Sequence, residues 1–184
     1  MKWKWLFTTF VLSIIPFPGW GSENVSPYAG QEQREIKTLS EEEIQGYLSG
    51  SGMGFAKAAE LNHYPGPKHV LELAEQLHLS AEQYQRTHVL FEEMKAKAVS
   101  LGQELVEKES LLDSLFAKAK ISEAQLQKLV TEISVIRGKL RFVHLGAHLE
   151  QRKILTPAQI QRYDKLRGYD SSGHIRRHHR HKHQ

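Results

Sequence analysis

The chain has 184 residues, the length of one domain with additional terminal segments. Its formal net charge is only +4 and it has no cysteine, so it lacks both the basic body of a nucleic-acid-binding protein and any thiol for disulfides or catalysis. The positive charge is concentrated at the two ends, and the body between them is close to neutral.

Residues 1–21 have the pattern of a secretory leader. Lys2 and Lys4 precede the apolar run Trp5–Phe17, which is short for a membrane span. Cleavage after Gly21 is one outcome and an uncleaved anchor is the other. The leader predicts export to the periplasm of a Gram-negative bacterium. Residues 22–38 are polar and are predicted to form a linker.

Helix starts are well marked along the rest of the chain. In four places a Ser or Thr is followed three residues later by Glu or Gln, which is a capping box, and an apolar residue precedes each cap. Four such signals predict an all-α domain. They are Leu39-Ser-Glu-Glu-Glu43, Leu79-Ser80-Ala-Glu-Gln83, Ile121-Ser-Glu-Ala-Gln125 and Leu155-Thr156-Pro-Ala-Gln159.

The first helices are expected to be short. They cover Glu41–Leu48 and Lys68–Leu77, and the glycine-rich stretch Gly50–Gly54 between them predicts a flexible joint.

Two long helices follow, over Ala81–Lys118 and Glu123–Ile154, because no proline interrupts this stretch and apolar residues recur every three or four positions. The short link between them predicts an antiparallel hairpin. Such a hairpin leaves more apolar surface than it buries, so we expect either the short helices or, preferably, a second copy to cover it. The apolar positions are Tyr84, Phe91, Met94, Ala98, Leu101, Leu105, Leu112 and Leu115, then Leu126, Leu129, Ile133, Ile136, Leu140, Val143 and Ala147.

A last helix over Pro157–Arg167 completes a folded domain of residues 39–169, and residues 170–184 are predicted to be a disordered tail. This tail contains five histidines, and a histidine-rich segment of this kind binds divalent metals loosely. The alternatives are a purification tag, which the interleaved arginines argue against, or a merely basic tail. The tail histidines are His174, His178, His179, His181 and His183.

His144 and His148 stand four residues apart, so on a helix they project from one face about 6 Å apart. Two neutral imidazoles at this spacing can share a zinc, copper, nickel or cobalt ion. The alternative is a pair of half-exposed histidines at the edge of the core stripe that bind no ligand. Residue 145 is leucine, so the general base of a zinc peptidase is missing. Without a nucleophile motif or a cofactor loop, neither an enzyme nor an organic cofactor is expected.

The leader, the paired Leu-Ser/Thr-x-x-Gln motifs, the long helices and the histidine-rich end resemble the Spy/CpxP superfamily of bacterial periplasmic proteins over Leu39–Tyr169. Its branches include ATP-independent chaperones and heavy-metal sensor or resistance proteins. The resemblance implies a hooked, cradle-like dimer without enzymatic activity.

The resemblance also implies metal ligands. In the metal-sensing relatives a His-x-x-x-Met pair precedes the last motif, and His144 and His148 stand at these positions. His69 matches one of two earlier histidines, with Leu73 in place of the other. Glu92 or Glu93 is the nearest match to a glutamate ligand.

We therefore expect a periplasmic, non-enzymatic stress or metal-resistance protein that acts as an ATP-independent chaperone and binds divalent metal through histidines. Its expected partners are a second copy and unfolded periplasmic proteins, without nucleic acid. The alternative is a dedicated heavy-metal sensor that passes a signal to a membrane partner.

Overall fold

The computed structural model describes residues 25–169, in which every regular element is a helix and none is a strand, so the predicted all-α class is confirmed. The expected leader (1–21) and tail (170–184) lie outside the described residues. A short 3₁₀ helix, η1 (Gln31–Gln33), precedes the α-helices. These are α1 (Glu41–Leu48), α2 (Lys57–Glu60), α3 (Pro67–Glu72), α4 (Ala81–Ala117), α5 (Glu123–Ile154) and α6 (Pro157–Leu166).

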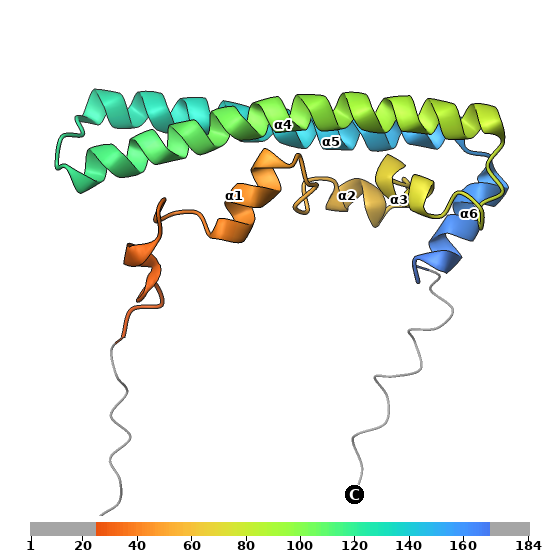
Figure 1. Ribbon diagram of the computed structural model, residues 1–184, viewed down its shortest axis with the longest axis horizontal. Helices are drawn as coiled ribbons and strands as arrows, with labels where there is room; N and C mark the ends of the chain where they lie inside the picture. Colours follow the sequence, from red (N-terminus) through yellow and green to blue (C-terminus); the bar gives the residue numbers. More distant parts are fainter. Residues whose placement is uncertain (1–24, 170–184) are drawn as a thin grey trace, which may run out of the picture.

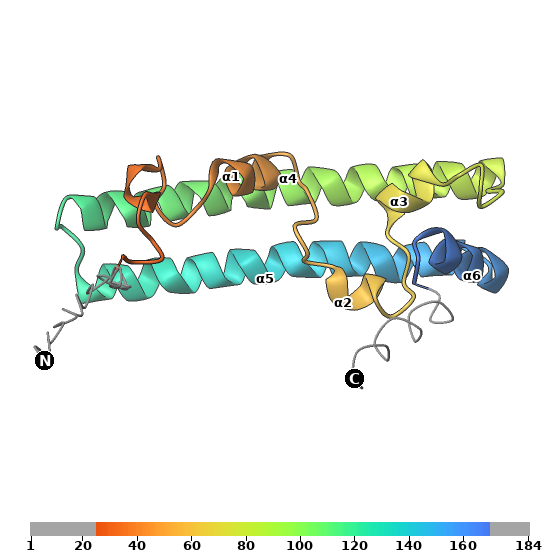
Figure 2. The ribbon, with the colours of Figure 1, turned by 90° about the horizontal axis from the view of Figure 1, so that it is seen from below.

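Helices α4 and α5 form the predicted long antiparallel hairpin, and the short helices lie along one side of it (Figure 1). Seen from that side, α1 and α3 lie against α4, and α2 lies against α5 (Figure 2). Helix α6 turns back under the open end of the hairpin. No element among residues 25–169 covers the opposite side.

All four predicted capping boxes are present. Ser40, Ser80, Ser122 and Thr156 each accept a hydrogen bond from the backbone N–H three residues on, and the side chain there accepts one from the N–H of the cap. Each box satisfies two helix-end donors that would otherwise lack partners. These local bonds explain why the starts of α1, α4, α5 and α6 were predictable.

Two of the boxes are also joined to each other through Gln83 and Gln159. The Nε2 of each amide donates to the Oε1 of the other at 2.9 Å. Gln83 Nε2 also donates to the Ile154 carbonyl at 2.9 Å, and Gln159 Nε2 to the Leu77 carbonyl at 3.3 Å. We call this reciprocal pair the amide lock. It ties the start of α4 to the start of α6 at the open end of the hairpin.

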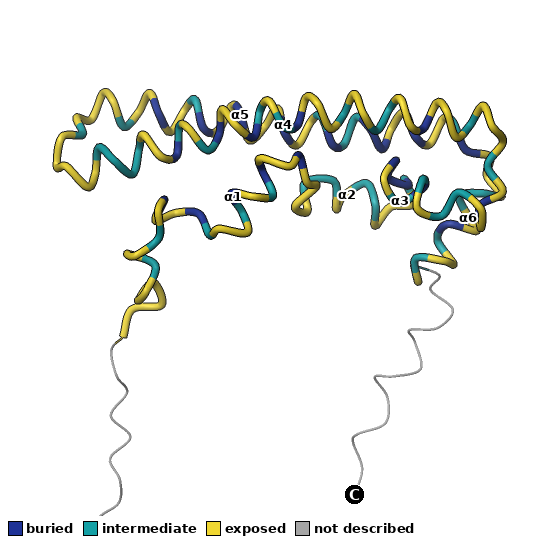
Figure 3. The backbone as a smooth tube through the Cα atoms, viewed as in Figure 1, coloured by how far each residue is buried: buried dark blue, intermediate teal, exposed yellow. Residues whose placement is uncertain are grey.

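Most of the buried apolar residues belong to two clusters. All buried positions are the dark segments of Figure 3. The smaller one, beside the amide lock, holds Val70, Leu77, Leu155 and Tyr163. The larger one, where α1 crosses the hairpin, consists of Ile36, Leu39, Ile44, Tyr47, Ala98, Leu105, Ile133, Ile136 and Leu140.

Helix α1 approaches α4 unusually closely at Gly102. A Cβ built at this position would lie 2.1 Å from the backbone oxygen of Tyr47. Only glycine allows this contact, so the larger cluster depends on the missing side chain.

Three details differ from the sequence expectation. Helix α3 ends at Glu72 instead of Leu77, because the chain turns through the following residues and buries Leu77 beside Tyr163. Tyr84, placed on the core stripe by its spacing, is exposed and stacks on His88. Within the expected linker Ile36 is buried in the larger cluster.

The amide lock should stabilise the fold beyond its two caps. Gln159→Ala removes a cap, both bonds to the Gln83 amide and the bond to the Leu77 carbonyl, so we expect a loss of about 2–4 kcal/mol in the free energy of unfolding. Gln125→Ala is the matched control, since Gln125 bonds only Ser122, and should cost about 1 kcal/mol. Urea denaturation followed by circular dichroism measures both. Equal losses of unfolding free energy in the two variants would mean that the amide lock adds nothing to the stability of the fold.

Candidate metal site

His144 and His148 lie on the inner side of α5 and are only 3% and 9% exposed, so they are buried and the expected half exposure is wrong. Both line a cavity of about 580 Å³ between the hairpin and the short helices. His69 of α3 and Glu60 of α2 line the same cavity. We call it the histidine cavity.

The ring of His148 is held in one orientation. Its Nδ1–H donates to the Tyr64 carbonyl at 2.7 Å, and because a carbonyl only accepts, Nδ1 must carry the proton. In the neutral ring Nε2 then carries the lone pair. Nε2 faces Gly66, where a Cβ would lie 2.8 Å away. A metal-binding imidazole has this arrangement, with the other ring nitrogen bound to a backbone carbonyl.

His144 stacks on Phe55, with ring centroids 5.8 Å apart and an interplanar angle of 10°. Its Nε2 is buried and has no hydrogen-bond partner. Burial, and secondarily the nearby His148, lower the pKa of His144 below its usual value. The imidazole is therefore held in the neutral form that binds metals.

Glu60 supplies a partly buried carboxylate beside these rings. Its Oε1 accepts hydrogen bonds from the hydroxyls of Tyr163 at 2.6 Å and Tyr169 at 3.1 Å, and lies 3.4 Å from Arg167 Nε. Its Oε2 has no hydrogen-bond partner and lies 3.7 Å from His148 Nδ1. Burial and the Glu60 bond raise the pKa of the Tyr163 phenol, which keeps it a donor.

The segment between α2 and α3 is fastened to the hairpin and to α6. Besides the Tyr64–His148 bond, Arg152 donates to the His63 carbonyl and lies 4.3 Å from the centroid of the Tyr64 ring. His63 Nδ1 lies 2.9 Å from Asp164 Oδ2. These contacts hold Gly66 against His148.

Residues 66–167 match the family described as LTXXQ motif family protein, which covers more than half of the chain and includes both motifs of the amide lock. The chain belongs to the LTXXQ family. This is the Spy/CpxP-type family that the motifs resembled. No curated protein and no solved structure shows significant similarity to the chain. Within residues 25–169, no helix has the length and apolar character needed to cross a membrane.

The LTXXQ resemblance implied further ligands, and the structure brings only some of them to the cavity. His69 is there, with Nδ1 2.8 Å from Glu72 Oε2, and this hydrogen bond lowers the pKa of Glu72. Glu92 and Glu93 are exposed on α4 and do not line the cavity. The tail histidines lie outside the described residues. No group of three His, Asp or Glu in residues 25–169 is arranged to hold a metal.

Glu60, Tyr64 and Gly66 were missed as site residues. The sequence signal was the segment Asn62–Pro67, where two prolines and a glycine fix the backbone beside a tyrosine and a histidine. Such a segment suggests an ordered turn. It does not indicate that its carbonyl will orient a histidine 84 residues away.

The buried His144 should make stability depend on pH. Its pKa is lowered in the fold from the ordinary 6.5, so below that pH the unfolded chain binds more protons than the native one. The free energy of unfolding should therefore fall as the pH drops through 6.5, by at most about 1.4 kcal/mol per unit from this residue. His144→Gln cannot titrate and should flatten the profile. Urea denaturation between neutral pH and pH 5 tests this, and parallel profiles would contradict it.

Proposed function

We propose that the protein is a non-enzymatic periplasmic protein that binds a divalent transition metal in the histidine cavity and takes part in metal resistance or envelope stress. The buried, unpartnered Nε2 of His144 carries this proposal. A neutral imidazole nitrogen facing a cavity without a hydrogen-bond partner costs stability, and a metal ion would repay that cost.

His144 and His148 would hold the ion. His148 presents Nε2 because Tyr64 holds the proton on Nδ1, and Gly66 leaves room beside that atom. His69 lines the same cavity from α3, with its Nδ1 engaged by Glu72. Imidazole ligands suit zinc, copper, nickel and cobalt. The ion would stabilise the fold and offer open positions to water.

A second function, ATP-independent binding of unfolded chains, is favoured by the mouth of the cavity. Met53 and Leu61 are large, apolar and exposed there, and Lys57 and Lys68 lie beside them. A mixed apolar and basic surface of this kind suits an unfolded client, whose apolar side chains and carboxylates it can contact. The two functions are compatible.

The alternative is a dedicated sensor. In that case the metal would change how α6 is held, because the Glu60 that binds Tyr163 and Arg167 lies beside His148. A membrane partner would then bind differently to the two positions of α6.

Metal binding is tested with a chain ending at Tyr169, which removes the tail histidines. Zinc, copper, nickel or cobalt at about 100 times Kd should raise the unfolding free energy by about 2.7 kcal/mol, seen as a higher melting temperature. His144→Ala and His148→Ala should each lose most of the shift. His88→Ala, an exposed histidine of α4, should keep it. No metal-dependent shift in the truncated chain would refute the site.

Client binding is tested by light scattering of a heat-treated or reduced client without ATP. A several-fold molar excess of the protein should suppress aggregation. Leu61→Asp should weaken this protection several-fold, because it places a charge at the apolar mouth of the cavity. Leu111→Asp changes an equally large exposed leucine elsewhere, on α4, and should not. If Leu61→Asp and Leu111→Asp weaken the protection equally, the client-binding surface is not at the mouth of the cavity.

A further inference from the structure

The histidine cavity is much larger than a metal ion requires. Its volume is about 580 Å³, whereas a water molecule takes about 30 Å³ of liquid. An ion with a few bound waters would therefore fill only a small part of it. Sites for small organic molecules usually have volumes of about 300–1,000 Å³.

Two histidines leave an ion in this cavity incompletely bound. His144 and His148 are neighbours on one face of α5, and no three His, Asp or Glu side chains of residues 25–169 are grouped to hold a metal. A zinc ion in a protein usually has four ligands. At least two positions would therefore face the open part of the cavity.

The charges on the cavity wall are unsuited to a bare cation. Lys57, Lys68 and Lys95 line the cavity, and the salt bridges within residues 25–169 leave Lys57 and Lys95 without a carboxylate. Lys68 lies 3.9 Å from Glu72, but both side chains are more than half exposed, so this pair is weak. The excess of positive charge repels a divalent cation and attracts an anion.

Glu60, the one carboxylate among the described residues that line the cavity, does not cancel this excess. Its charge is balanced by Arg167, which also lines the cavity and whose Nε lies 3.4 Å from Oε1. Its other oxygen lies 3.7 Å from Nδ1 of His148, which is not the nitrogen available to a metal. The charges of three lysines therefore remain on the wall.

The glycine-rich segment Gly50–Gly54 adds hydrogen-bond donors to the same wall. It lines the cavity, and the N–H groups of Gly52, Met53 and Gly54 make no backbone hydrogen bond within the described residues. The φ angles of Gly50, Met53 and Gly54 are 69°, 41° and 78°. Successive N–H groups in turns that include left-handed residues form concave anion sites. The segment expected to be a flexible joint therefore has a conformation that suits an anion.

We propose that the histidine cavity takes the metal together with a small organic anion that carries two or more carboxylates, so that the ligand is an anionic metal chelate. This inference rests on the proposed metal function of the same cavity. His144 and His148 hold the ion, and carboxylate oxygens of the anion fill its remaining positions. The three lysines and the N–H groups of Gly50–Gly54 balance the remaining negative charge.

Binding of a chelate reverses the usual effect of a chelator. Citrate in solution competes with a protein for zinc and lowers the apparent affinity of the protein for the ion. If the cavity takes the chelate, an equimolar amount of citrate should instead strengthen zinc binding. Because the coupling between two ligands is reciprocal, zinc should strengthen citrate binding by the same factor.

The test is equilibrium dialysis of the full chain with isotope-labelled citrate, with zinc and without it. The chain ending at Tyr169, which keeps every described element, is measured in parallel. Both chains should bind citrate roughly tenfold more tightly when zinc is present. In the shorter chain His144→Ala should abolish this gain, because it removes a metal ligand.

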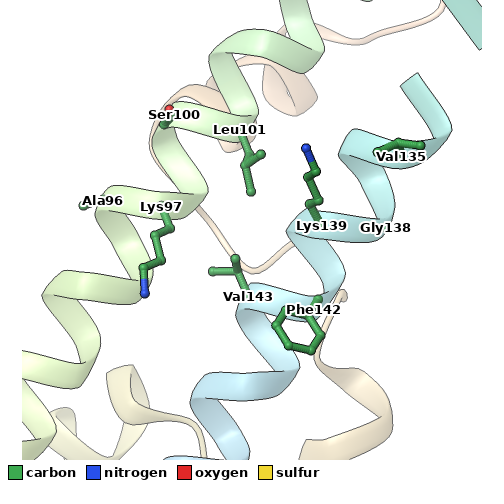
Figure 4. A pocket seen from close by; sticks show the side chains of 9 residues that line it. All are labelled: Ala96, Lys97, Ser100, Leu101, Val135, Gly138, Lys139, Phe142 and Val143. Atoms are coloured by element: carbon green, nitrogen blue, oxygen red, sulfur yellow. The ribbon is translucent and has the colours of Figure 1, made fainter. Parts of the chain in front are cut away.

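The double variant Lys57→Gln/Lys95→Gln separates the effect of charge from a loss of structure. It should raise the Kd of zinc with citrate about fivefold, the size expected for two exposed ion pairs. Zinc alone should bind no more weakly, whereas a damaged cavity would bind both more weakly. The control Lys97→Gln/Lys139→Gln makes the same change of charge at the groove between α4 and α5 on the outer side of the hairpin (Figure 4), and should change neither Kd.

The outcomes separate this inference from the proposed function. If zinc alone binds and citrate only removes it, the inference is wrong and the metal function stands. Equal retention of citrate without zinc, or retention by the full chain alone, would also overturn the inference. If zinc binds neither alone nor with citrate, both are wrong. Zinc binding that requires citrate would support the inference and explain a negative result with the bare ion.

Discussion

The reciprocal hydrogen bonds between Gln83 and Gln159 hold together the end of the molecule that contains the histidine cavity. The side-chain oxygen of each glutamine accepts the bond that completes its own capping box. The NH₂ group of each glutamine donates to the other glutamine, so the two motifs are joined although they lie far apart in the sequence. This fixes α6 beneath the open end of the hairpin. Tyr163 of α6 is thereby brought to Glu60, and Glu60 to His148. No residue of the family motif lines the histidine cavity. The motif therefore affects the cavity indirectly, by fixing the position of α6.

The histidine cavity is lined by five separate stretches of the chain, and contacts between these stretches orient the two histidines. Tyr64 sets the tautomer of His148, Gly66 leaves space beside its ring, and Phe55 stacks on His144. The short helices thus do more than cover apolar surface. They enclose two buried imidazoles, and the Nε2 of His144 has no hydrogen-bond partner there, which costs stability. The outer side of the hairpin has the opposite character, because Val135, Phe142 and Leu149 are exposed there and no element among residues 25–169 covers them.

The parts of this fold that could be predicted are those with local causes. Capping boxes and apolar spacing placed α1 and α5 at their observed bounds, because hydrogen bonds over three residues and packing over four leave a mark in the sequence. The histidine pair was predictable for the same reason. Its burial was not, since that depends on the segment at Tyr64. Glu60 resembled an ordinary charged residue of a short helix, and only the return of α6 gives it partners. Tyr84 shows the converse, because helical spacing alone cannot tell which apolar positions a neighbour will cover.

The position of the amide lock at the open end of the hairpin has a kinetic consequence. Contacts near the α4–α5 turn join residues close in sequence, such as Glu109 and Arg137, 28 apart, whereas Gln83 and Gln159 are 76 apart. Closing a long loop costs more entropy than closing a short one. The contacts of the hairpin should therefore form first near its turn and last at its open end. The lock would then form after the rate-limiting step of folding. Weakening the lock should leave the folding rate nearly unchanged and increase the unfolding rate, so the motif slows the unfolding of the chain.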